Sequence, residues 1–166
     1  YEENYGATAT IPFSVGSFWN SQITLDGSIL KDVCDSFHAI RFNQTKFRGI
    51  AMMNNTFKLF SEPDIRLELN SMYVSSFIQG IYDISPIWKI DAGLKWTFAG
   101  KKAELKLKAN DLFDSFNPDT KINYKGQHLI MNQRRDSRNI SVSFVYKFGG
   151  YKAKEHKSVD TSRFGF

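Results

Sequence analysis

The 166 residues leave room for one domain, and the single cysteine, Cys34, excludes an internal disulfide framework. No run of about 20 apolar residues is present, which excludes a transmembrane helix but not transmembrane β-strands, in which only alternate residues of about ten need be apolar. The net charge of +5 comes from lysines and arginines spread along the chain, without a recognition-helix pattern or zinc-ligand spacing, so we expect no nucleic-acid partner and no cofactor.

The N-terminal half contains stretches that alternate between apolar and polar residues. Residues 7–15 (ATATIPFSV) and 19–29 (WNSQITLDGSI) place their apolar side chains at every second position. A period of two is that of a β-strand with two unlike faces. A third strand is predicted at about 47–59, although Ile50 and Asn55 interrupt its alternation.

The alternation is more regular in the C-terminal half. A fourth strand is predicted at 65–77, and residues 88–98 (WKIDAGLKWTF) separate an apolar face with aromatic ends from a polar one. Residues 103–110 and 140–148 complete a set of seven strands, and we find no amphipathic helix. The last three strands keep charges off their apolar face, which favours lipid over a protein core because a charge near the bilayer midplane costs about 2–4 kcal/mol.

The connections between the predicted strands alternate in length. Short turns and longer, more polar loops follow each other in strict order, which is typical of a membrane β-barrel with periplasmic turns and extracellular loops. The short connections are 16–19, 60–64 and 99–102, and the long ones are 31–46, 78–86 and 114–136.

Aromatic residues gather where the predicted strands end. Rings with an apolar body and a polar edge favour the two membrane interfaces, so we expect two aromatic girdles. Beside the short turns and at the end of the last strand lie Trp19, Phe57, Trp96, Phe98, Tyr146 and Phe148, and near the long loops lie Tyr73 and Trp88.

The polar faces carry charged residues that we expect to point into a barrel lumen. They would either contact a lumen-filling domain and steer an anionic solute, or simply line a wet interior and pair across strands. Asp91 and Glu104 are not a catalytic pair, because nothing nearby supplies a nucleophile or a metal site, and we expect no enzyme. The expected lumen-facing residues are Arg66, Glu68, Lys89, Asp91, Lys95, Glu104, Lys106 and Lys108.

A basic cluster, Arg134, Arg135 and Arg138, lies where the last long loop re-enters the membrane. Arginine binds phosphate through a bidentate fork, so the cluster is a candidate site for lipopolysaccharide phosphates or substrate. Alternatively, the cluster only fixes the end of the strand at the level of the lipid headgroups.

Seven spanning strands cannot close a barrel of the usual even count. An open sheet would leave two unpaired edges in hydrocarbon, where unsatisfied backbone groups are prohibitive. The chain is therefore expected to be the last part of a larger barrel, unless an eighth strand lies within about 119–131.

The last third resembles a known family. Asn110, Asp111, Leu112 and Phe113 follow one strand, and the final strand from Arg138 to Phe148 alternates as RNISVSFVYKF. These motifs resemble the C-terminal end of TonB-dependent outer-membrane receptors, with the closest likeness to the Bacteroidetes outer membrane β-barrel branch. The segments 77–98 and 159–166 are similar to that branch as well.

The resemblance implies an all-β, antiparallel up-and-down transmembrane β-barrel of about 22 strands, with residues 1–148 as its C-terminal part and 149–166 as a flexible basic periplasmic tail. It implies a Gram-negative outer membrane, uptake of an iron chelate, cobalamin, glycan or peptide, and a lumen filled by an N-terminal plug. Implied partners are outer-membrane lipid, the plug and remaining strands, TonB through the N-terminus and a surface lipoprotein. The alternative is a small barrel or a structural subunit of an outer-membrane complex without active transport.

Overall fold

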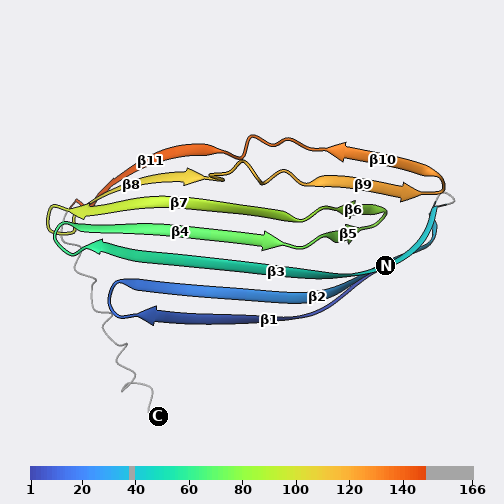
Figure 1. Cartoon of the computed structure of the whole chain (residues 1–166), viewed down its shortest axis with the longest axis horizontal. Helices are drawn as coiled ribbons and strands as arrows, with labels where there is room; N and C mark the ends of the chain where they lie inside the picture. The colour runs from blue at the N-terminus through green and yellow to red at the C-terminus, as the bar shows by residue number, and fades with distance from the viewer. Residues whose placement is uncertain (38–39, 149–166) are drawn as a thin grey trace, which may run out of the picture.

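The computed structural model describes residues 1–37 and 40–148, which form two antiparallel β-sheets (Figure 1). No helix in this described part is long and apolar enough to cross a membrane. The large sheet contains, in spatial order, β1 (Glu2–Val15), β2 (Trp19–Phe37), β3 (Ile40–Phe60), β4 (Asp64–Val74), β7 (Ile87–Phe98), β8 (Ala103–Asn110) and β11 (Asn139–Tyr146). The small sheet contains β10 (Gln127–Asn132), β9 (Asp119–Tyr124), β6 (Tyr82–Ile84) and β5 (Phe77–Gln79).

Short turns join β1 to β2, β3 to β4 and β7 to β8 at one end of the large sheet, as the sequence predicts. Residues with positive φ make these reversals tight: Gly16 in the first turn, and Ala99, Gly100 and Lys101 in the third. We refer to this end as the turn end and to the opposite end as the outer end.

The predicted long loops are mostly strands. Residues 31–37 and 40–46 are the far halves of β2 and β3, 78–86 includes the β5–β6 pair, and 114–136 includes the β9–β10 hairpin. Cross-strand pairing satisfies the backbone whatever the side-chain pattern, so these outer strands need no alternation of apolar and polar residues. The alternation therefore predicts only that part of each strand which has one apolar and one polar face.

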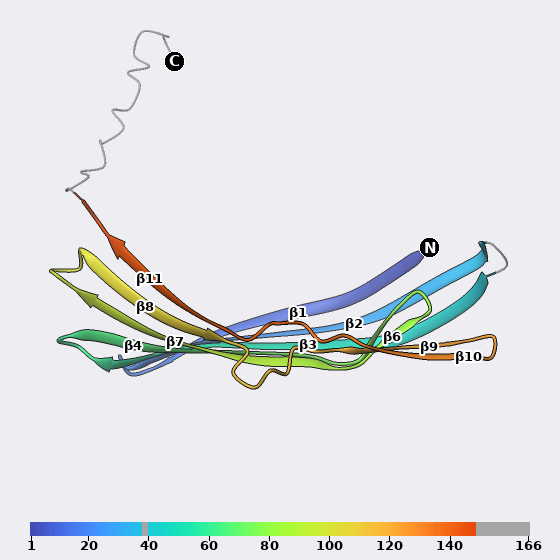
Figure 2. The same cartoon turned by 90° about the horizontal axis from the view of Figure 1, so that it is seen from above.

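The candidate eighth strand at 119–131 does not join the large sheet. β9 pairs with β6 and β10, and all three belong to the small sheet. In the described residues, β1 and β11 are thus the two open edges of a seven-stranded sheet that does not close into a barrel. Figure 2 shows this sheet as a curved layer whose two edge strands bend toward the same side.

Polar contacts connect the small sheet to the outer half of the β2–β3 hairpin. Asp32 is 6% exposed and accepts a hydrogen bond from the backbone N–H of Gly80 in the β5–β6 turn. The Lys46 ammonium pairs with Asp83, and the Tyr124 hydroxyl accepts from the N–H of Arg41 at 2.8 Å. The outer strands therefore form one connected structure.

The expected basic tail, 149–166, lies outside the described residues, so its predicted flexibility and periplasmic location stay predictions. Phe148, the last residue described, is 88% exposed.

Replacing Asp32 with alanine should loosen the β5–β6 hairpin. The Gly80 N–H loses a charged acceptor, which contributes about 1.5 kcal/mol, so its hydrogen exchange should accelerate about tenfold. Asp35→Ala, an exposed change on the same strand, is the control and should leave exchange unchanged. Equal exchange at Gly80 in both variants would contradict the contact.

Candidate functional site

The strand register aligns the apolar positions of all seven strands on one face. Each residue of this face pairs directly with a residue of the same face on the next strand, and directly paired residues point to the same side of a sheet. The large side chains on this face are well exposed: Leu94 is 42% and Val142 is 69% exposed. One row across the sheet consists of Val15, Trp19, Phe57, Leu67, Leu94, Leu107 and Val142.

The height of this apolar face matches a bilayer. Trp88 and Phe98 bound it on β7 and lie ten residues apart, as do Phe47 and Phe57 on β3. Ten extended residues span about 34 Å along a strand, and a tilt of about 40° reduces this to about 26 Å of height. The apolar band of outer-membrane barrels is about 25 Å tall.

Aromatic contacts gather at both limits of the face, some between neighbouring strands and some along a single strand. At the turn end, the Trp19 ring lies 5.2 Å from Phe13 and 5.7 Å from Phe57, between ring centroids. Trp96 stacks on Phe98 at 4.4 Å, and Tyr146 lies 4.7 Å from Phe148.

At the outer end, Tyr73 pairs in register with Trp88, whose ring centroid lies 5.9 Å from that of Phe113. Tyr5 and Phe47 both pair in register with Ile29, and neither is among the girdle residues predicted from the sequence. Phe47 could have been predicted from the sequence, because it lies ten residues before Phe57, as Trp88 lies ten residues before Phe98.

Asn55 explains one interruption of the predicted alternation. Its side chain lies on the apolar face, where its amide oxygen accepts from Trp19 Nε1 at 3.0 Å and from Ser21 Oγ at 2.9 Å. Its amide nitrogen donates to the Leu69 carbonyl at 3.2 Å. A polar group that is satisfied in this way is tolerated in an apolar environment.

The opposite face brings together the predicted lumen-facing charges. Arg66, Lys95 and Lys106 are aligned across β4, β7 and β8 by the register, with carboxylates in the adjacent rows. Lys108 lies on the same face and has no ion pair within the described residues. The ion pairs are Arg66–Asp64 (3.0 Å), Lys106–Glu68 (2.6 Å), Lys89–Asp91 (3.1 Å) and Lys95–Glu104 (2.8 Å).

At the turn end this polar face has a hollow of about 280 Å³. Only Asp64 and Glu104 supply negative charge to it, against five cationic side chains. The cations are Arg66, Lys95, Lys101, Lys102 and Lys147. The hollow is therefore positive and suited to an acidic partner.

Asp111 organises the outer end of β7, β8 and β11. It is 1% exposed, and its carboxylate accepts from the backbone N–H groups of Ser115 and Phe116 and from the hydroxyl of Ser137. Its own N–H donates to Asp91 at 2.8 Å. These bonds hold the segment between β8 and β9 against β7 and against the start of β11.

The three arginines of the predicted basic cluster have different surroundings. The Arg135 guanidinium lies 5.9 Å above the Phe116 ring, and its backbone N–H donates to Asn117. Arg134 lines a polar hollow beside Trp88, and Arg138 is exposed just before β11.

Replacing Asp111 with asparagine should destabilise the outer end. An amide cannot accept all the hydrogen bonds of the carboxylate, so we expect a loss of about 2–3 kcal/mol in the free energy of unfolding, measured by urea titration. Asp114→Asn is the control, since within the described residues the Asp114 side chain has no hydrogen bond. Equal stability of the two variants would show that the Asp111 contacts contribute little.

Comparison with known proteins agrees with this two-faced sheet. Residues 1–146 match the model of the outer membrane protein β-barrel family. No curated protein and no solved structure matches the chain. Because the family match covers nearly the whole described chain, the protein belongs to the outer membrane protein β-barrel family, which implies an outer-membrane location.

Proposed function

We propose that the chain forms the C-terminal part of a larger outer-membrane barrel that takes up a scarce or bulky solute in the manner of a TonB-dependent receptor. The observation that carries the proposal is the pair of open edges, β1 and β11. Unpaired N–H and C=O groups in hydrocarbon cost several kcal/mol each, so further strands must cover both edges.

Strand direction limits what these further strands are. Six antiparallel pairings separate β1 from β11, so both edge strands run toward the turn end. A second copy in the same membrane orientation would offer only parallel pairing at either edge. An antiparallel barrel needs instead an odd number of additional strands, which a longer polypeptide supplies.

The polar face supports a lumen that holds another domain. Its ion pairs and the positive hollow at the turn end suit a wet interior in contact with an acidic surface of a plug. In this proposal the plug blocks the lumen until TonB acts through the N-terminal part of the parent protein, and a surface lipoprotein would contact the outer hairpins. The solute class stays open among iron chelates, cobalamin, glycans and peptides.

A single arginine should distinguish the two faces. Leu69 and Asn70 are adjacent near the middle of β4 and lie on opposite faces. Leu69→Arg should lower the unfolding free energy of the complete protein in lipid vesicles by about 2–4 kcal/mol, because its charge enters hydrocarbon. Asn70→Arg, next to Asp91, should change it by less than about 1 kcal/mol. Equal losses would remove the assignment of lipid to the apolar face.

Photo-cross-linking tests the open edges. Benzoylphenylalanine at Ile11 in β1 or at Ile140 in β11 should react, in cells, with strands that lie outside residues 1–148, and mass spectrometry identifies the linked peptides. A link between β1 and β11 would overturn the larger barrel and support the alternative, a small barrel or a structural subunit.

Binding to TonB tests active transport separately from the barrel. The complete protein in detergent should bind the periplasmic domain of TonB, detected by surface plasmon resonance, and should lose binding when its N-terminal segment is removed. A larger barrel without TonB binding would remove active transport and leave the barrel assignment intact.

A further inference from the structure

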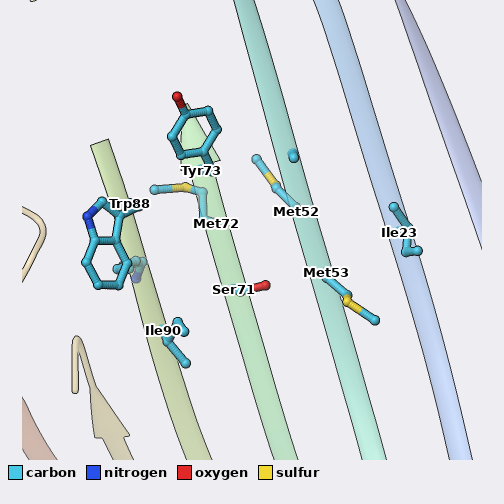
Figure 3. Close-up of a pocket in the computed structure, with 10 residues that line it drawn as sticks. Ile23, Met52, Met53, Ser71, Met72, Tyr73, Trp88 and Ile90 are labelled. Atoms are coloured by element: carbon cyan, nitrogen blue, oxygen red, sulfur yellow. The ribbon is translucent and has the colours of Figure 1, made fainter. Parts of the chain in front are cut away.

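The apolar face is not smooth at its outer end. A hollow of about 420 Å³ lies over β2, β3, β4 and β7 (Figure 3). Ser71 has a small side chain and lies among larger ones, with Ile23 and Met53 on one side and Ile90, Tyr73 and Trp88 on the other. The small side chain of Ala51 also lines the hollow. Its accessible lining is almost wholly apolar, as an acyl chain requires.

A second hollow, of about 440 Å³, adjoins the first and is mostly polar. It lies among the segments that connect β8 to β9 and β10 to β11. Asp114, Asp119, Asn132 and Arg134 line it, and within the described residues none of their side chains makes a hydrogen bond. All four residues are exposed, so a ligand could reach these groups by displacing only water.

Trp88 lines both hollows, so an apolar hollow and a polar one lie on either side of the same residue. The connecting segment after β8 lies on the same side of the sheet as the apolar face, because its Phe113 contacts the Trp88 ring. Figure 2 shows this segment projecting from the side opposite to that toward which β11 bends. The polar hollow thus lies just beyond the apolar band, where a lipid headgroup would lie.

The polar groups indicate the type of headgroup. Two carboxylates against one arginine leave the hollow with a net negative charge, which disfavours a phosphate. Carboxylates accept from hydroxyl groups, the Asn132 amide both donates and accepts, and arginine donates, so the set matches a polyhydroxylated ring. An indole beside such groups adds an apolar platform for a sugar face.

We propose that these two hollows bind a glycolipid of the outer leaflet, with one acyl chain over Ser71 and its sugar headgroup among Asp114, Asp119, Asn132 and Arg134. The inference rests on the proposed membrane placement of the apolar face. It assigns the site to a resident lipid that is bound outside the lumen and independent of any transported solute.

Native mass spectrometry of the intact protein, extracted from its membrane in mild detergent, tests the site. The probes are monoglucosyl diacylglycerol, phosphatidylglycerol with the same acyl chains, and free glucose, each added singly. The glucosyl lipid should bind at least fivefold more tightly than phosphatidylglycerol, and glucose alone should not bind in the same range. Equal binding of the two lipids would overturn the sugar headgroup, and tight binding of glucose would overturn the acyl-chain hollow.

Three variants locate the binding. Ser71→Phe fills the apolar hollow and Asn132→Ala with Asp119→Ala removes polar contacts, so each should weaken binding of the glucosyl lipid at least fivefold. Ala109→Phe adds the same ring on β8, outside both hollows, and should bind as the wild type does. Unchanged binding in the first two variants would place the lipid elsewhere.

A folding check separates this inference from the proposed function. Each variant is first shown to keep its heat-dependent mobility shift in gel electrophoresis, which reports a folded barrel. A folded, membrane-inserted protein without selective glucosyl lipid binding refutes the glycolipid site alone. A failure of Leu69→Arg to differ from Asn70→Arg refutes the membrane placement on which both rest.

Discussion

The cross-strand register is the constraint on which the two faces of the sheet depend. Side chains alternate along a strand with a period of two, so a slip of one residue in any pairing would move a whole apolar set to the polar face. In this protein, six pairings keep rows such as Trp19–Phe57–Leu67 in line. The aromatic contacts at the turn end and the Asp111 contacts at the outer end act on these same strands, and both oppose a slip.

Hydrocarbon explains why much of the fold is predictable from sequence. Lipid on one side and water on the other place opposite demands on alternate residues, so 88–98 indicates a two-faced strand without further information. The short turns are predictable as well, because they lie where these alternating stretches end. The outer hairpins are not predictable in this way, because β5, β6, β9 and β10 lie where the alternation is no longer required. Their placement depends on contacts such as that of Asp32 with Gly80.

The candidate sites are also only partly predictable from the sequence. Arg66, Lys95 and Lys106 lie on one face, as predicted, because alternate residues of a strand point to the same side. It does not predict which carboxylate each of them meets, since that depends on register. In the sequence, Asn55 interrupts the alternation. In the folded sheet its amide oxygen accepts hydrogen bonds from the Trp19 indole and the Ser21 hydroxyl, which lie more than thirty residues away along the chain.

The length of the β2–β3 hairpin has a mechanical consequence. β3 continues seven residues beyond Phe47, about 23 Å of extended chain, and its backbone ladder with β2 continues down to the turn end. A ribbon of this kind is stiff along its length, and the small sheet braces it through Lys46 and Asp83. A force on the outer part of this ribbon is therefore transmitted along the β2–β3 ladder to the part of both strands that belongs to the two-faced sheet.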